Sequence, residues 1–313
     1  MRFLMVGAGA TGGYFGGRLL EAGCDVTFLL RPRRAAQLRE TGLVIRSPHG
    51  DVTIENPPFT LAEDISAPFD VVVVSSKAYD LEGTIESFAP AVGPGTRILP
   101  LLNGMRHIDR LNEQFGAERV LGGVCFISST LDDEGAIVHL NDVHTLVFGP
   151  QGGGSSTEAQ AVEAEFRKTK FQAKASREIM HDMWEKWVFI SSLGALTSLM
   201  RASVGDVMTA VGDRLALSLL EECNGIARRN GFEPRAEAND RARRFLTTPG
   251  SPLQASMAKD IERGARIEAD HIIGDLLARD TAPEAGGNGW SLLRVAYAGL
   301  KAYEARRERE SAG

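Results

Sequence analysis

The chain is poor in the residues that build disulfide scaffolds and metal centres. Its 313 residues include three cysteines, six histidines and three tryptophans. Cys24, Cys125 and Cys223 lie far apart with no CxxC pair, and the histidines form no HExxH motif. This usage predicts reduced cysteines that pack as small buried hydrophobes. No bound metal is expected.

Long apolar runs and an excess of positive charge are also missing. No apolar run approaches the roughly 20 residues that span a bilayer, and Met1–Val6 is too short for the core of a signal peptide. A net charge of −6 argues against a nucleic-acid partner. With 43% hydrophobic and 24% charged residues, the composition is that of an ordinary globular protein. We therefore expect a cytoplasmic protein whose partner is a small molecule, with no membrane and no nucleic acid.

The first half of the chain alternates short β-branched runs with helical stretches. Helices are expected over Tyr14–Ala22 and Arg33–Glu40, and this alternation indicates right-handed crossovers and a parallel sheet. The run of four valines from Val71 is apolar on both strand faces, as in a central parallel strand. The predicted strands are Phe3–Val6, Asp25–Leu30, Val71–Ser75, Arg97–Leu101, Val120–Ile127, Ile137–Leu140 and Thr145–Phe148.

After about Ser176 the strand-like runs stop, and apolar residues recur at spacings of three and four, which is typical of amphipathic helices. We predict an α/β fold with two domains. Residues 1–175 form a Rossmann-type domain with a doubly wound parallel sheet, and residues 176–313 form an all-α domain. Between them, Gly149–Gln160 is interpreted as a surface loop that leads into a helix capped by Thr157, and "FQAKAS" as one more strand.

The pattern G-x-G-x-x-G stands directly after the first strand and before the first helix. In dinucleotide-binding folds the first glycine permits a tight turn, the second lets the backbone approach the pyrophosphate, and the third lets helix and strand pack closely. The alternative is a glycine-rich turn without a ligand. The place of the pattern at the opening of a βαβ unit favours a dinucleotide site. Its residues are Gly7, Ala8, Gly9, Ala10, Thr11 and Gly12.

The end of the second strand indicates which dinucleotide binds. An NAD site usually places an acidic residue there to hold the ribose hydroxyls. This chain has Arg31 instead, followed by Arg33 and Arg34. A guanidinium can make paired hydrogen bonds to a 2′-phosphate. We therefore predict NADP(H), with a solvated basic helix start as the alternative.

Six stretches, in this order, together resemble the ketopantoate reductase (2-dehydropantoate 2-reductase) family. They are "GAGATGGYFGGRL", "FLLR", "SSKAYD", "LLNGM", "MWEKW" and "SMAKDIERGARIEADHIIG". The resemblance covers nearly the whole chain. It implies NADPH-dependent reduction of a 2-oxo acid to a 2-hydroxy acid, in a cleft between a Rossmann domain and a helical domain. Whether the chain is a monomer or a homodimer is left open.

The resemblance also assigns roles to residues of the first half. Gly7–Gly12 correspond to the pyrophosphate loop and Arg31 to the contact with the 2′-phosphate. Lys77 corresponds to a lysine near the cofactor phosphate and ribose, and Asn103 to a residue between nicotinamide and substrate. From the residues alone, Lys77 could equally be an exposed loop lysine, and Asn103-Gly104 is an ordinary turn dipeptide.

In the second half the resemblance identifies Lys186 as the proton donor, with Glu268 ordering it and Ser256 binding the substrate carboxylate. Negative charge builds on the carbonyl oxygen during hydride transfer, so a nearby ammonium stabilises it and then delivers the proton. On one straight helix, residues 256 and 268 would lie roughly 18 Å apart, which predicts a break at Gly264. His271 is interpreted as a helix-surface group.

The chain departs from the family pattern in the substrate pocket. Four positions where the family usually carries asparagine or another polar residue are apolar or glycine here, namely Ile190, Gly194, Val204 and Leu253. This difference predicts ketopantoate or a related, more apolar 2-oxo acid as substrate. The segment "DTAPEAGGNGW" is also shorter and richer in glycine than the family pattern.

Two other functions remain as alternatives. One is an NADP(H)-binding sensor without catalysis, which the lost asparagines favour and which Lys186 and Glu268 oppose. The other is a β-hydroxyacid or imine reductase on a related plan, which the matches at Ser256 and Glu268 oppose.

Overall fold

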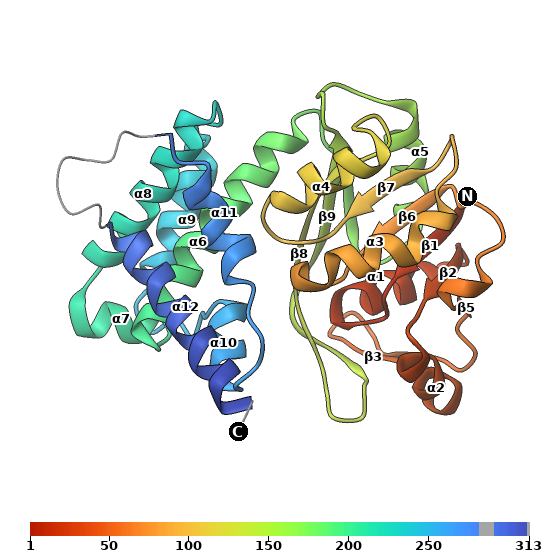
Figure 1. Ribbon diagram of the computed structural model, residues 1–313, viewed down its shortest axis with the longest axis horizontal. Helices are drawn as coiled ribbons and strands as arrows, with labels where there is room; N and C mark the ends of the chain where they lie inside the picture. Colours follow the sequence, from red (N-terminus) through yellow and green to blue (C-terminus); the bar gives the residue numbers. More distant parts are fainter. Residues whose placement is uncertain (282–290, 312–313) are drawn as a thin grey trace. The chain divides into compact units, whose positions relative to one another are not determined.

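The computed structural model describes residues 1–281 and 291–311. The described chain forms two compact units (Figure 1). The first contains residues 1–102 and 107–182, and the second contains residues 103–106 and 183–313. The short segment 103–106 thus belongs to the second unit although the residues on both sides of it belong to the first.

A five-stranded parallel sheet forms the centre of the first unit. Its order is β5-β2-β1-β6-β7, and all its neighbouring strands run parallel. From β1 the chain moves outward to one side through β2 and β5, and then to the other through β6 and β7. This confirms the doubly wound Rossmann-type fold. The strands are β1 (Arg2–Val6), β2 (Asp25–Leu29), β5 (Phe59–Thr60), β6 (Val71–Val74) and β7 (Arg97–Pro100).

The valine run behaves as its composition predicts. All four residues of β6 are buried, and the strand lies between β1 and β7. A strand covered on both faces has no polar side to present, so a continuous apolar run is the pattern that fits it.

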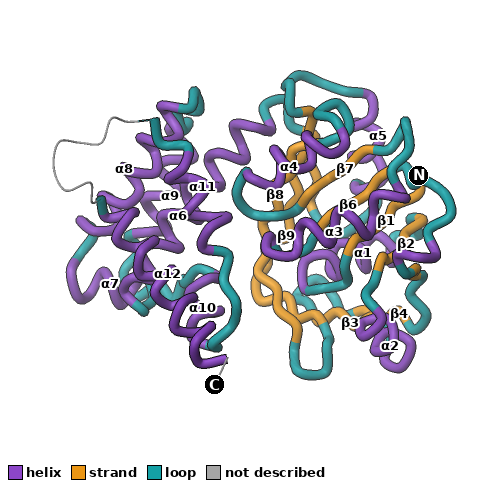
Figure 2. The backbone as a smooth tube through the Cα atoms, viewed as in Figure 1, coloured by secondary structure: helices purple, strands orange, loops and turns teal. Residues whose placement is uncertain are grey.

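A second, mixed sheet lies in the same unit (Figure 2). Its order is β10-β9-β3-β4, and β8 pairs antiparallel with β9. The two runs predicted over 137–148 form one strand, which pairs with β8 on both sides of the polar, exposed residues Asn141 and Asp142; the register shifts between these two paired stretches. Three short strands, β3, β4 and β5, escaped prediction. The second sheet comprises β3 (Leu43–Arg46), β4 (Val52–Ile54), β8 (Leu121–Leu131), β9 (Ile137–Pro150) and β10 (Gln172–Ala175).

The last helix of the first unit corrects one expected cap. The side chain of Ser156 accepts a hydrogen bond from the backbone nitrogen of Ala159 at 3.0 Å, so Ser156 is the N-cap and Thr157 is the first helical residue. Serine and threonine both cap well, and only the extended backbone of Ser156 distinguishes them. The helices are α1 (Ala10–Glu21), α2 (Pro32–Thr41), α3 (Leu81–Phe88), α4 (Arg106–Phe115) and α5 (Thr157–Phe166), with short 3₁₀ turns at Ala62–Asp64, Ala78–Asp80 and Ala89–Ala91.

Helix α1 packs against both sheets through its glycines. A Cβ atom at Gly16 would lie 2.6 Å from Cε1 of Phe28 in β2. A Cβ at Gly17 would lie 2.6 Å from Cδ1 of Ile45 in β3, so the same helix also touches the mixed sheet. Side chains larger than hydrogen do not fit at these positions, and the glycines therefore set the distance between α1 and both sheets.

The described part of the second unit is helical. The expected break between Ser256 and Glu268 is confirmed: α10 ends at Glu262, and Gly264 adopts a φ of 67°. The elements are α6 (Ile179–Met200, which begins in the first unit), α7 (Val204–Val211), α8 (Arg214–Arg229), α9 (Ala236–Leu246), α10 (Ser256–Glu262), a π-helical turn (Asp270–Gly274), α11 (Asp275–Ala278) and α12 (Leu292–Ser311). Most of the glycine-rich segment 280–290, namely 282–290, lies outside the described residues.

Within the described residues, no single helix is both long and apolar enough to cross a membrane. Helices α6 and α7 are long and apolar enough only when taken together, and the chain bends by 65° at the break between them. Both Trp184 and Trp187 of α6 are buried in the protein. The buried core helices of globular proteins can have the same length and apolar composition.

All three cysteines are free and buried, as expected from their spacing. Burial raises the pKa of the Cys223 thiol to about 12. A thiol that stays protonated is a poor nucleophile and a poor metal ligand. Cys223 is therefore a packing residue.

The glycine contacts of α1 generate a stability prediction. In Gly16→Ala the methyl group meets the Phe28 ring, and overpacking of about 1–3 kcal/mol exceeds the roughly 1 kcal/mol that alanine gains in a helix. Gly83 in α3 has no atom within 4 Å of its Cβ position, so Gly83→Ala is the matched control and stabilises by about 0.5–1 kcal/mol. Urea unfolding followed by circular dichroism measures both. Equal stability of the two variants would contradict close packing of α1.

Candidate functional site

The glycine loop joins β1 to α1 in the first unit. The chain turns at Gly7, whose φ of 91° is unfavourable for any residue with a Cβ. The backbone nitrogen of Gly7 donates to the carbonyl of Leu29 at 3.0 Å, which anchors the loop to the end of β2. The loop therefore stands at the carboxyl edge of the parallel sheet, where such sheets bind their ligands.

Gly9 and Gly12 meet different surroundings. A Cβ at Gly12 would lie 2.0 Å from Oγ of Ser75 and 2.4 Å from the carbonyl oxygen of Gly7, so this glycine is required by packing. A Cβ at Gly9 would meet nothing within 4 Å, and its φ of −81° suits any residue. Packing within the protein does not explain Gly9. The open space beside its α carbon leaves room for a ligand to approach the backbone.

The first turn of α1 is open to an anion. Gly9 is its N-cap and provides no side chain to accept from the helix N–H groups, and the first turn contains no acidic residue. Free N–H groups and the helix dipole together favour a phosphate at such an end. This arrangement is the one that the glycine pattern predicts.

The residues that follow β6, the strand next to β1, lie beside the glycine loop. Ser75, which follows β6, donates its hydroxyl hydrogen to the carbonyl of Val6 at 2.9 Å. Lys77 comes two residues later and is exposed. Strand order reverses between β1 and β6, and ligands of doubly wound sheets bind at that switch point. Lys77 thus follows the strand whose end forms the crevice.

The arginines after β2 make different contacts. The Arg31 side chain is 73% exposed and forms a 3.3 Å ion pair with Asp80. Arg34 is half-buried; its Nε donates to the carbonyl of Ala8 at 3.0 Å, and its Nη2 donates to that of Gly135 at 3.0 Å. Burial lowers the pKa of Arg34. Arg34 therefore braces the glycine loop, whereas Arg31 points its charge toward solvent.

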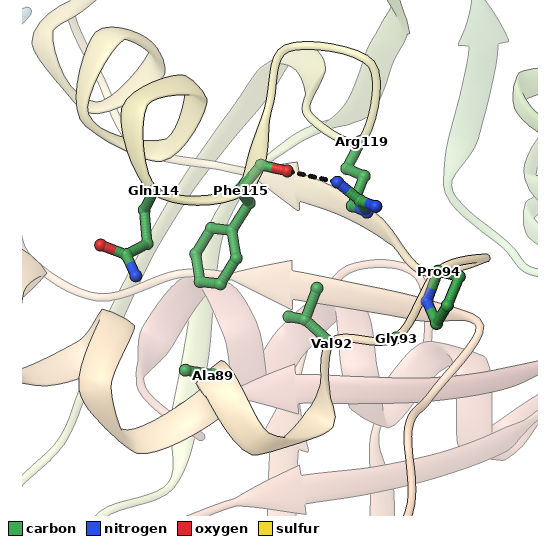
Figure 3. A pocket seen from close by; sticks show the side chains of 7 residues that line it. All are labelled: Ala89, Val92, Gly93, Pro94, Gln114, Phe115 and Arg119. Carbon is green, nitrogen blue, oxygen red and sulfur yellow. Dashed lines mark hydrogen bonds between the residues drawn. The ribbon is translucent and has the colours of Figure 1, made fainter.

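A surface pocket elsewhere in the first unit is not a candidate active site. It lies between the end of α4 and the turn after α3 (Figure 3). Its one charged lining residue is Arg119, which donates to the carbonyl of Phe115 at 2.7 Å. The pocket contains none of the predicted site residues. It is lined by Ala89, Val92, Gly93, Pro94, Gln114, Phe115 and Arg119.

In the second unit, Lys186 lies half-buried on α6 between two buried tryptophans, Trp184 and Trp187. The indole nitrogen of Trp187 donates to the carbonyl of Ile272 at 2.8 Å, and the Ser191 hydroxyl donates to the same oxygen at 3.2 Å. Helix α6 is thereby fixed to the π-helical turn that follows Glu268. Lys186 thus lies on a helix that is bonded to the turn beginning two residues after Glu268.

His271 corrects the expectation of a surface group. It is only 7% exposed, and its ring hydrogen-bonds to the backbone of Asn103. A Cβ at Gly104 would lie 2.8 Å from the carbonyl oxygen of His271, so the two segments are in close contact. Burial lowers the pKa of His271 although the nearby Glu268 opposes that shift, and the neutral ring donates to a backbone carbonyl. The structure therefore brings together Asn103, Glu268 and His271.

Ser256 begins α10 and is exposed. Its neighbour Met257 packs toward α6, because a Cβ at Gly194 would lie 3.1 Å from Cε of Met257. The backbone nitrogen of Ala255 donates a hydrogen bond to Oγ1 of Thr197 on α6, at 3.2 Å. Ser256 thus begins a helix that packs against α6, the helix that carries Lys186.

Comparisons with known proteins identify the family. Residues 3–153 match the model described as "Ketopantoate reductase PanE/ApbA", and residues 178–288 match the model of its C-terminal part. The chain is 37% identical to the uncharacterized oxidoreductase YkpB of Bacillus subtilis (strain 168), over 98% of this chain and all of that protein. The chain belongs to the ketopantoate reductase family. It is an oxidoreductase with a nicotinamide cofactor.

Solved structures of the ketopantoate reductase fold superpose over almost the whole chain. The 2-dehydropantoate 2-reductase of Geobacter metallireducens GS-15 has 27% identity and a TM-score of 0.85, covering 96% of this chain and 99% of that one. D-mandelate dehydrogenase with NADH and anilino(oxo)acetate has 19% identity and a TM-score of 0.84, covering 98% and 100%. At 19% identity, the similarity to D-mandelate dehydrogenase shows a shared fold alone.

Two residues of the site escaped prediction. Arg34 was visible only as one of three arginines, and nothing in "RPRR" tells which one folds back onto the loop. His271 follows Glu268 by three residues, a spacing that puts both on one side of a helix. That spacing was a usable signal, and the expectation of a solvated ring overlooked the contact with the Asn103–Gly104 turn.

The contrast between Gly9 and Gly12 gives a paired prediction. Gly9→Ala folds normally but binds the dinucleotide roughly tenfold or more weakly, since a methyl group inserted into a close contact costs about 1–3 kcal/mol. Gly12→Ala loses stability, because its methyl group collides with the Gly7 carbonyl. Fluorescence titration with NADPH and thermal unfolding separate the two effects. Normal nucleotide affinity in Gly9→Ala would contradict the prediction that the dinucleotide approaches the backbone at Gly9.

Proposed function

We propose that this member of the ketopantoate reductase family uses NADPH to reduce a 2-oxo acid more apolar than ketopantoate. The observation that carries the proposal is the composition of one face of α6. Lys186, Ile190 and Gly194 follow one another at intervals of four residues, so they lie on the same side of the helix. A cationic proton donor therefore neighbours an apolar side chain and a glycine.

The chemistry requires a donor beside the reacting carbonyl. When bound, the nicotinamide would supply a hydride to C2 of the oxo acid, so that negative charge would build on the C2 oxygen. The ammonium of Lys186 stabilises that charge and gives up its proton, which completes the 2-hydroxy acid. Ser256 binds the substrate carboxylate, and Glu268 orders the lysine.

Asn103 orients the nicotinamide and the substrate, because an amide both donates and accepts. The backbone of this residue is held by the buried ring of His271, and the following Gly104 packs on the backbone of His271. His271 is therefore a positioning residue. It fixes Asn103 without contacting the reacting atoms.

Two contacts support the choice of a more apolar substrate. Met257 occupies the space beside Gly194, and the backbone nitrogen of Val204 donates to the carbonyl of Leu253 at 2.9 Å. Val204 is fully buried and Leu253 is half-buried. The side chains at these positions have no oxygen or nitrogen that could hydrogen-bond a substrate hydroxyl. A site without hydrogen-bond partners for the hydroxyl does not favour a hydroxylated acid.

NADPH is proposed over NADH because of Arg31. Its ion pair with Asp80 is mostly exposed and therefore weak, so a phosphate can replace the carboxylate at small cost. Arg34 is already committed to the carbonyls of Ala8 and Gly135. Arg31 is the side chain left to bind a 2′-phosphate in the paired geometry.

A substrate panel tests the reaction. NADPH consumption is followed by absorbance with ketopantoate, 4-methyl-2-oxopentanoate and phenylglyoxylate. We expect the two apolar acids to give the higher kcat/KM, and Lys186→Ala to lower kcat by about 10²–10⁴. Lys174→Ala, which changes an exposed lysine of β10, is the control and keeps the rate. Binding of NADPH without turnover of any acid would refute the reductase and support the NADP(H)-binding sensor.

Cofactor choice is tested at Arg31. We expect Arg31→Ala to raise the KM for NADPH about 10- to 100-fold, because a charge-assisted pair contributes roughly 1.5–3 kcal/mol, and to leave the KM for NADH nearly unchanged. Arg33→Ala removes an exposed arginine from the same helix and is the matched control. A wild-type enzyme that prefers NADH, or an equal loss for both cofactors, would overturn the assignment.

A further inference from the structure

Three histidines gather in the first unit, away from the residues assigned to the oxidoreductase site. His139 and His144 lie on β9 and are 4% and 5% exposed. His49 is half-buried in the turn between β3 and β4. One nitrogen of each ring lies within 4.8 Å of the corresponding nitrogens of the other two. Neither the glycine loop nor the proposed catalytic residues account for this cluster.

Each ring bonds at least one oxygen, and His139 bonds two, since its Nδ1 also lies 3.0 Å from the Ser47 hydroxyl. Nε2 of His49 donates to the carbonyl of Asp142 at 2.9 Å, and Nε2 of His139 donates to that of Val143 at 3.1 Å. Since carbonyls only accept, both Nδ1 atoms carry a lone pair. Metal-binding histidines typically make this kind of second bond, which fixes the tautomer and the orientation of the ring.

His144 follows the same pattern with a side-chain partner. Its Nδ1 lies 2.7 Å from the hydroxyl of Tyr14, and its Nε2 is the remaining nitrogen. A tyrosine hydroxyl both donates and accepts. The bond to Tyr14 therefore persists when the proton of the ring stays on Nδ1 and Nε2 binds an ion.

Burial lowers the pKa of His139, and burial together with His49, His139 and Arg18 lowers that of His144 to about 4. The Arg18 guanidinium is itself paired with Glu21 at 2.7 Å and bonded to the carbonyl of Gly50 at 2.7 Å. Metal ions bind the neutral form of imidazole.

We propose that His49, His139 and His144 form a three-histidine site for a divalent transition metal of the zinc, nickel or copper class. Imidazole nitrogens suit these ions, whereas magnesium and calcium prefer oxygen ligands. With three protein ligands, the fourth position is left for water. This site is independent of the reductase activity proposed above.

Two local adjustments accompany binding. The three rings are stacked on one another with interplanar angles of 16° to 26°, and His49 and His144 are nearest, with centroids 3.7 Å apart, so His49 must turn out of the stack and the other two rings must tilt to share an ion. His49 is the least buried of the three and lies in the turn closed by the bond from Gly50 N to Ser47 O. The Ser47 hydroxyl, 3.0 Å from Nδ1 of His139, must turn aside. An ion would then join the β3–β4 turn to β9.

The test is calorimetric titration of the full chain, stripped with EDTA, with zinc chloride and with copper chloride. We expect one ion per chain for the wild type. His139→Gln and His144→Gln each weaken binding at least about tenfold. His181→Gln, which alters a histidine of α6 outside the cluster, binds like wild type. Copper electron paramagnetic resonance should show nitrogen hyperfine structure that the cluster variants lose.

Fold and cofactor controls make the result decisive. Each variant is checked for its thermal midpoint without metal and for its affinity for NADPH, both of which should stay near wild type. Absence of stoichiometric binding, or binding that survives the cluster variants, would overturn the proposal and leave the histidines as a packed, acid-sensitive cluster.

Discussion

The close approach of α1 to two sheets is the constraint on which the first unit depends. Gly16 and Gly17 bring the helix within contact distance of Phe28 and Ile45, which belong to different sheets. The position of the helix fixes its N-terminus, and Gly12 locks that end against Ser75. Because the helix is held by packing, the N–H groups of its first turn are placed before any ligand arrives. A preorganised anion site costs little to bind a phosphate.

In the second unit, hydrogen bonds hold the elements of the proposed site in fixed positions. The Ile272 carbonyl accepts from Trp187 and Ser191, so α6 and the π-helical turn keep one relative position. π-Helical turns are rare and frequently occur at functional sites. Here the turn places His271 against the Asn103–Gly104 segment and follows directly on Glu268. Buried, mutually bonded elements hold the proposed proton donor and its partners more rigidly than loops would.

Helix α1 also connects the cofactor loop with the histidine cluster. Tyr14 comes two residues after Gly12 and bonds His144, and Arg18 on the next turn bonds the carbonyl of Gly50. The rest of the helix therefore carries polar contacts to β9 and to the β3–β4 turn. An ion bound by the histidines would strengthen the same packing that positions the loop, without entering the chemistry of the oxidoreductase.

The sequence by itself determined the parallel sheet, the glycine loop, the helical second half and the break at Gly264. These features depend on local periodicity and on glycine conformations that no other residue adopts readily. It also determined the family, since matched residues along the whole chain are more specific than any one pattern. The mixed sheet was decided only by tertiary structure, because β3 is stabilised by pairing with the distant strand β9, and the short strand β4 pairs only with β3.

Tertiary structure likewise decided which polar side chains matter. Arg34 and Arg31 are neighbours of the same type, yet one folds onto Ala8 and the other faces solvent. His271 is buried because a turn from residue 103 packs on it, and the three clustered histidines come from two separate parts of the chain. Burial and long-range contact set the role of a polar group, and neither is encoded in the spacing of its near neighbours.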